Sequence, residues 1–196
     1  AIAVLMRRNV QAAPFEEELA RRQVGFRLVG GKRTADKKAA RDLFAYLSVT
    51  GSGKNELAFR RAITTPTRGL AATSLDRIVA SSPAVGGDLL RVKASSVEGL
   101  ASKRAQVLTE FQRLILKARQ LVCAPGARPG AVFHEILNEV GYRQRLEQEI
   151  TNARLLARQL GDLDRTLDLL NSAWNDPALG AHPRQRLIGF VNRMLL

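Results

Sequence analysis

Helical periodicity dominates the chain from residue 53 to its end, and no segment there alternates apolar and polar residues as a half-buried strand does. The strongest pattern, at residues 103–122, predicts one buried face made of Val107, Phe111, Leu114, Ala118 and Leu121. A second stripe is predicted at Leu163, Leu167, Leu170 and Trp174. The expected helices cover residues 57–63, 74–80, 103–122, 131–140, 143–160, 162–174 and 184–196.

The first thirty residues have a different pattern. Residues 1–6 (AIAVLM) and residues 24–29 (VGFRLV) are apolar runs, typical of strands buried on both faces. Between them, Pro14 and the acidic residues 16–18 favour the first turns of a helix. This order predicts a parallel β-α-β crossover. Because two parallel strands cannot form a sheet core alone, we expect the chain to be a segment of a longer protein that holds the remaining strands.

The segment at residues 50–53 (TGSG) breaks the helical pattern and separates these two regions. We therefore predict a mainly α chain made of two units. Residues 1–49 would hold the small β-α-β edge and one further helix, and residues 50–196 would form an all-α domain.

The formal net charge of +13 implies a polyanionic partner, with nucleic acid as the first candidate and an anionic membrane surface as the second. No apolar run is long enough to span a membrane. The single cysteine, Cys123, excludes an internal disulfide and fits a reducing cytoplasm. The densest basic cluster is either a solvated helix face or a phosphate-binding surface. It comprises Lys32, Arg33, Lys37, Lys38 and Arg41.

Patterns for catalysis or metal binding do not occur in the sequence. Residues 51–54 (GSGK) resemble half of a phosphate-binding loop, but the earlier glycine is lacking, and Asn55 stands where a Mg²⁺-binding Ser or Thr is needed. The two histidines, His134 and His182, lack metal-ligand spacing. We predict neither a catalytic residue nor a metal site in this chain, and we interpret Trp174 as a core residue.

A weak internal repeat occurs in the helical region. Residues 68–71 (RGLA) and residues 98–101 (EGLA) each place a Gly-apolar-small turn before a helix with Ser or Thr near its start. This is the shape of a helix-hairpin-helix turn, in which the backbone N–H groups of a helix N-terminus can hold a DNA phosphate.

Several motifs resemble one continuous stretch of the UvrD, PcrA and Rep helicases of superfamily 1. They are residues 3–11 (AVLMRRNVQ), 16–19 (EEEL), 25–31 (GFRLVGG), 42–47 (DLFAYL), 62–70 (AITTPTRGL) and the later pair 141–142 (GY). In that family the stretch holds motif IV and the following region of the RecA-like domain 2A, and then the inserted domain 2B. The resemblance spans nearly the whole chain, and the motifs keep their order and spacing.

The resemblance implies particular roles for particular residues. Arg7 matches the motif IV arginine that reaches the γ-phosphate of ATP, and Gly69 and Gly99 match the two turns through which domain 2B contacts duplex DNA. Among the departures from the family pattern, Met6 replaces an aromatic that stacks on adenine, and Ala71 and Ala101 replace the second glycine of each turn. The predicted DNA contacts are Arg33, Lys37, Lys38, Arg68, Gly69, Thr73, Gly99, Ser102, Lys103 and Arg104.

The resemblance also implies an activity for the parent protein. We expect an ATP-dependent 3′-to-5′ DNA helicase of the cytoplasm that uses ATP and Mg²⁺, acts at a junction of single strand and duplex, and works with helicase domains 1A, 1B and 2A. The family's other ATP-binding motifs do not occur in this chain, so we expect it to bind no cofactor and hydrolyse no ATP alone. Two alternatives are a stand-alone helix-hairpin-helix DNA-binding module and a protein-interaction scaffold. We expect no membrane as a partner.

Overall fold

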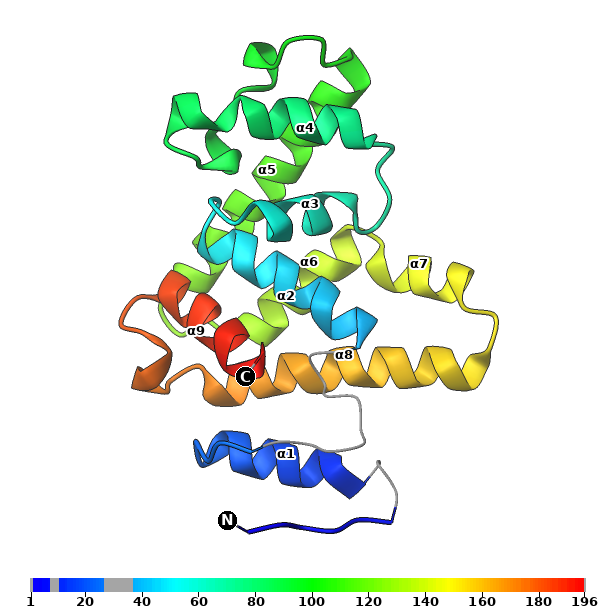
Figure 1. Cartoon of the computed structure of the whole chain (residues 1–196), viewed down its shortest axis with the longest axis vertical. Coiled ribbons are helices and arrows are strands. Elements are labelled where there is room, and N and C mark those ends of the chain that lie inside the picture. Colours follow the sequence, from blue (N-terminus) through cyan, green and yellow to red (C-terminus); the bar gives the residue numbers. More distant parts are fainter. Residues whose placement is uncertain (1, 8–10, 27–36, 196) are drawn as a thin grey trace.

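The computed structural model of the chain describes residues 2–7, 11–26 and 37–195 (Figure 1). Within these ranges the chain is mainly helical, as predicted, and contains no strand. The α-helices are α1 (Ala12–Arg21), α2 (Lys38–Gly51), α3 (Glu56–Thr64), α4 (Ala72–Ala80), α5 (Ser102–Cys123), α6 (Pro129–Glu139), α7 (Tyr142–Glu149), α8 (Ala153–Ala173) and α9 (Pro183–Leu195). The described ranges also contain the short 3₁₀ helices η3 (Ser82–Val85), η4 (Leu89–Arg91), η5 (Ala94–Ser96) and η6 (Pro177–Leu179).

Of the predicted β-α-β edge, the described residues form only the helix, α1. Residues 2–6 and 24–26 are irregular, while residues 1 and 27–29 of the predicted strands lie outside the described residues. A strand forms when its backbone pairs with a neighbouring strand, and the described ranges offer no such neighbour. Side chains that a sheet would bury are instead exposed, with Ile2 at 97% and Leu5 at 96%.

Helix α2 lies in the middle of the helical body, with α3, α5, α8 and α9 packed around it (Figure 1). Its side chains Leu43, Tyr46 and Leu47 are fully buried and belong to the same hydrophobic core as those of the later helices. The boundary that we predict between two domains at Thr50 stays a prediction. In the structure, α2 packs against the helices that follow it and shares their hydrophobic core.

The predicted apolar stripes are confirmed in part. Leu163, Leu167, Leu170 and Trp174 are all buried on α8. On α5 the buried face is rotated slightly from the predicted one, because Leu108, Ile115 and Val122 are buried while Leu121 is 37% exposed.

The predicted break between two helices at Gly161 is wrong. Helix α8 runs through Gly161, and the break lies at residues 150–152, where the Asn152 side chain accepts a hydrogen bond from the Leu155 amide at 3.0 Å. A glycine inside a helix is unfavourable by only about 1 kcal/mol, whereas an asparagine cap satisfies an otherwise unpaired amide and marks a helix start.

Two arginines from distant helices hold the C-terminal end of α2. Arg119 of α5 donates to the carbonyl oxygens of Thr50 at 2.7 Å and Val49 at 3.2 Å, and Arg184 of α9 donates to that of Gly51 at 3.1 Å. Burial, with a smaller contribution from the nearby Arg184, lowers the pKa of Arg119. Because the last carbonyl groups of a helix have no partner within it, these donors satisfy them and fix α5 and α9 to α2.

A buried carboxylate joins three helices. Asp42 of α2 is 2% exposed and accepts hydrogen bonds from Arg61 Nε of α3 at 2.8 Å and from the Tyr142 hydroxyl of α7 at 2.7 Å. Buried charges persist where they are paired and hydrogen-bonded, as this one is on both oxygens. The network therefore fixes how α3 and α7 sit on α2.

Both tyrosines of the chain should resist ionisation while it is folded. Burial raises the pKa of Tyr46 and of Tyr142, and the negative charge of Asp42 raises the pKa of Tyr142 further. Because each folded-state pKa lies above the unfolded value of about 10, the stability that the neutral phenols contribute is complete below that pH and is lost as the pH rises through the folded-state values. Phenolate absorbance should appear only when the chain unfolds, and an ordinary titration in the folded chain would contradict this.

Candidate nucleic-acid interface

Two glycine-led turns have the same backbone form. Gly69 has φ +71° and Gly99 has φ +65°, and each precedes an apolar residue and then the residue that begins a helix. Glycine adopts this left-handed conformation without the steric penalty that a Cβ brings. The first turn leads into α4 and the second into α5.

The alanines that replace the second glycine of each turn do not distort it. Ala71 has φ −75° and ψ 156°, and Ala101 has φ −61° and ψ 146°, both in the extended region open to any residue. Neither position requires positive φ. Each turn therefore adopts its form with positive φ at its first glycine alone.

The helix N-termini after these turns present unpaired backbone donors. No side chain caps α4 or α5, and the first amides with backbone partners are those of Ser74 and Arg104, which donate to Ala71 and Ala101. In the described part of the chain, the amides at positions 72, 73, 102 and 103 have no hydrogen-bond acceptor. Such amides, together with the positive end of the helix dipole, favour an anion such as phosphate.

Cations accompany the second turn. Lys103 is exposed and Arg104 half-buried, and neither forms an ion pair with any residue that the structure describes. Thr73 and Ser102, two of the predicted contact residues, are exposed at the helix starts. Arg77 of α4 donates to the Gly99 carbonyl at 2.5 Å, so α4 also holds the turn before α5. Sequence reasoning missed Arg77, because its partner lies 22 residues away.

Three of the predicted DNA-contacting cations have partners within the chain. Lys37 pairs with Asp162 at 2.7 Å, with only 18% of its side chain exposed, and Lys38 pairs with Glu149 at 3.3 Å. Arg68 donates to the carbonyl oxygens that end α3 and to the Tyr46 hydroxyl, and its guanidinium lies 5.5 Å from the centre of the Phe111 ring. These contacts give Arg68 and Lys37 structural roles and leave Lys38 as a surface ion pair.

The remaining predicted residues fall at the N-terminal end. Arg7 is exposed, and Arg33 lies outside the described residues.

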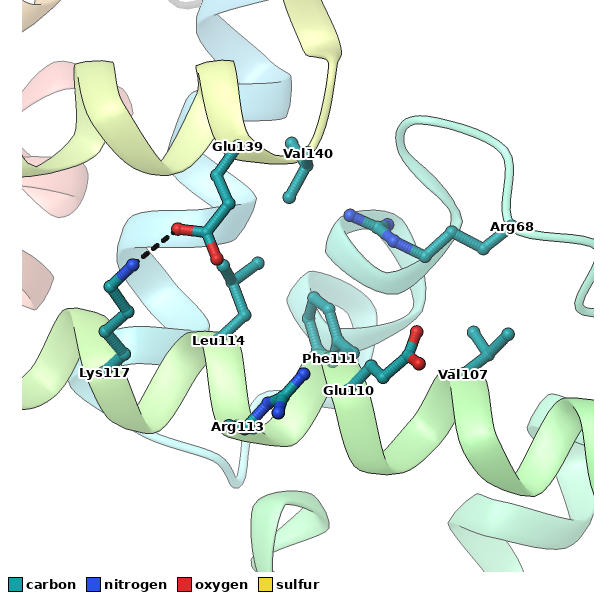
Figure 2. A pocket seen from close by; sticks show the side chains of 9 residues that line it. All are labelled: Arg68, Val107, Glu110, Phe111, Arg113, Leu114, Lys117, Glu139 and Val140. Atoms are coloured by element: carbon teal, nitrogen blue, oxygen red, sulfur yellow. Dashed lines mark hydrogen bonds and ion pairs between the residues drawn. The ribbon is translucent and has the colours of Figure 1, made fainter.

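The cavity nearest to Arg68 carries no catalytic arrangement. It has a volume of about 320 Å³ and lies along α5, with Phe111 and Leu114 at its apolar floor (Figure 2). An ion pair between Lys117 and Glu139, 2.6 Å long, spans the side formed by α5 and α6. Its lining contains no Ser, Cys or His that could act as a nucleophile or base. We assign no reaction to this cavity.

In the described part of the chain, no helix is sufficiently long and apolar to cross a membrane. No group of acidic, histidine or cysteine side chains there has the arrangement of a metal site.

Packed helices and a net charge of +13 are typical of helical domains that meet a polyanion such as nucleic acid. The chain belongs to the UvrD-like helicase C-terminal domain family, which it matches over residues 1–166.

Curated relatives of the chain are ATP-dependent DNA helicases by name. The ATP-dependent DNA helicase PcrA of Bacillus subtilis (strain 168) is 31% identical over 150 residues, which cover 76% of this chain and 20% of the relative. The ATP-dependent DNA helicase PcrA of Staphylococcus aureus (strain Mu50 / ATCC 700699) is 28% identical over 160 residues, with the same two coverages. The chain thus spans about one fifth of the length of these relatives.

Proposed function

We propose that this chain works within an ATP-dependent 3′-to-5′ DNA helicase or translocase, where it contacts duplex DNA beside a junction with a single strand. Residues 1–49 would contribute an edge of a 2A-like domain, and the later helices a 2B-like domain. The relatives are ATP-dependent DNA helicases by name, and the net charge of +13 suits a phosphate backbone. The parent protein would be cytoplasmic, and domains 1A, 1B and 2A would be its partners.

The observation that carries the proposal is the pair of equivalent helix starts. Each offers two unpaired amides after a left-handed glycine, and the second adds Lys103 and Arg104. Phosphate contacts of this kind position a protein on DNA without reading its sequence. We therefore propose Gly69, Thr73, Gly99, Ser102, Lys103 and Arg104 as the DNA-contacting set. Arg68 would act indirectly, by fixing the end of α3 before the first turn.

ATP and Mg²⁺ would act in the parent protein. Among the residues of this chain, Arg7 fits a role toward ATP, because it is exposed and a cation can stabilise the charge of a transferring phosphoryl group. Residues 51–54 comprise the last residue of α2 and most of its link to α3, and the Lys54 amide donates to Ser52 Oγ at 3.3 Å. They lack the pattern of a nucleotide-binding loop. We expect no DNA-stimulated ATP hydrolysis by the purified chain.

Binding to DNA should depend steeply on salt. For a duplex with a 3′ overhang, the logarithm of the association constant should fall linearly with the logarithm of the salt concentration, with a slope of about −2 or steeper, because Lys103 and Arg104 alone would displace two counterions. Fluorescence anisotropy at several salt concentrations measures this slope. A salt-independent affinity, or binding equally strong to an uncharged backbone analogue, would contradict phosphate recognition and favour the protein-interaction alternative.

A further inference from the structure

Three exposed cations outside the predicted set come from two segments that meet in space. Lys54 belongs to the loop between α2 and α3, and Arg91 and Lys93 belong to the segment at η4. The Leu89 amide donates to the Gly53 carbonyl at 3.0 Å, which places the two segments side by side. None of the three cations has an ion-pair or hydrogen-bond partner for its side chain within the described ranges.

The η4 segment is anchored so that its cations face outward. Leu89, Leu90 and Val92 are buried, whereas Arg91 and Lys93, which alternate with them, are exposed. Gln112 of α5 donates to the carbonyl oxygens of Leu89 at 3.0 Å and Val92 at 2.8 Å, which fixes the segment against the helix.

The acidic neighbours of this segment form no ion pair with its three cations in the described part of the chain. Asp88 accepts a hydrogen bond from the Leu90 amide at 3.1 Å and begins η4, and its single negative charge offsets only part of the three positive charges. Glu98 lies beyond η5, next to the second turn, and Glu56 pairs with Arg60 at 2.7 Å. The positive charge of Lys54, Arg91 and Lys93 therefore remains open to a partner.

The same segment leads into the second glycine-led turn. Lys93 is followed by η5 and then by Gly99, so the chain passes along the N-terminal half of α5 between Gln112 and Ser102. Ten residues of helix correspond to about 15 Å. A DNA strand carries one phosphate for roughly every 3.4 Å of helix axis, so a strand along this flank would present several phosphates.

We propose that Lys54, Arg91 and Lys93 form a cation track that binds the backbone of duplex DNA beyond the phosphate held at the Gly99 turn. The proposal rests on the proposed function and extends it, because it assigns a second contact region that the glycine-led turns do not include. The track would add affinity without sequence preference and would set how far the duplex follows α5.

The test compares two triple variants of the chain. Lys54→Gln, Arg91→Gln and Lys93→Gln together should make the slope of log affinity against log salt shallower by about 2 to 3, since each lost phosphate contact removes roughly 0.9. The control carries Arg128→Gln, Arg154→Gln and Arg158→Gln, which remove the same charge from exposed cations at the start of α6 and on α8. Circular dichroism and thermal unfolding would establish that both variants fold.

The outcomes are separable. A shallower slope for the track variant and an unchanged slope for the control support the track. Equal changes in both variants, or none in the track variant, overturn the track while leaving the proposed function standing. If the native chain shows no salt-dependent binding to duplex DNA, the proposed function fails and the track fails with it.

Discussion

Replacing Asp42 with alanine should lower the free energy of unfolding by about 3 kcal/mol. The substitution leaves the buried Tyr142 hydroxyl without an acceptor, which costs about 1–3 kcal/mol, and it strands the charge of Arg61. The Arg61 side chain is 37% exposed, so it regains water, and the total should stay at the lower end of the 3–5 kcal/mol range typical of a broken buried pair. Urea denaturation measures the change.

The control for this substitution is Glu139→Ala. Glu139 pairs with Lys117 at 2.6 Å, but both side chains are about half exposed, so its loss should cost less than about 1 kcal/mol. If Asp42→Ala were no more destabilising than Glu139→Ala, the network of Asp42, Arg61 and Tyr142 would not hold α3 and α7 on α2.

Proline at the first position of α4 and α5 should weaken DNA binding without weakening the fold. Ala72→Pro and Ser102→Pro each remove one unpaired amide, and proline is well tolerated at the first residue of a helix. Ala71 and Ala101 already have the extended conformation that a following proline requires. Since a hydrogen bond to a charged group contributes about 1.5–3 kcal/mol, each variant should bind duplex DNA roughly 10- to 100-fold more weakly.

The matched control is Ala153→Pro at the first position of α8. The preceding residue, Asn152, is also extended, with φ −79° and ψ 105°, and α8 lies outside the proposed interface. Its affinity for DNA should equal that of the native chain. If both Ala72→Pro and Ser102→Pro bound DNA normally with intact helices, the backbone amides would not contribute to binding. The side-chain cations would then be the remaining candidates for phosphate contact.

The helical part of the fold could be predicted because its core is built from local periodicity. The stripe from Leu163 to Trp174 is set by spacing on a single helix, and the structure buries it as expected. Local periodicity could not decide whether the two apolar runs near the N-terminus form strands. An apolar run such as residues 2–6 becomes a strand only through hydrogen bonds to another strand, and no described segment supplies one.

The backbone form of the two turns could be predicted from the sequence, whereas the partners of the nearby cations could not. A glycine before an apolar and a small residue is a local signal, and both Gly69 and Gly99 have the positive φ that glycine permits. Whether a lysine is free depends on distant partners. Lys37 forms an ion pair with Asp162, which lies 125 residues away. Lys54 and Arg91 lie on separate segments that a hydrogen bond between Leu89 and Gly53 brings together, and their side chains have no partner among the described residues. Sequence alone contains no sign of either arrangement.

If the amides at the starts of α4 and α5 bind backbone phosphates of DNA, their resonances should respond to DNA. Nuclear magnetic resonance of the backbone amides, recorded during titration with a duplex carrying a 3′ overhang, measures this response. The largest shifts should fall at Ala72, Thr73, Ser102 and Lys103. Unchanged resonances at these four amides, with saturable shifts elsewhere on the protein, would show that DNA binds at another surface.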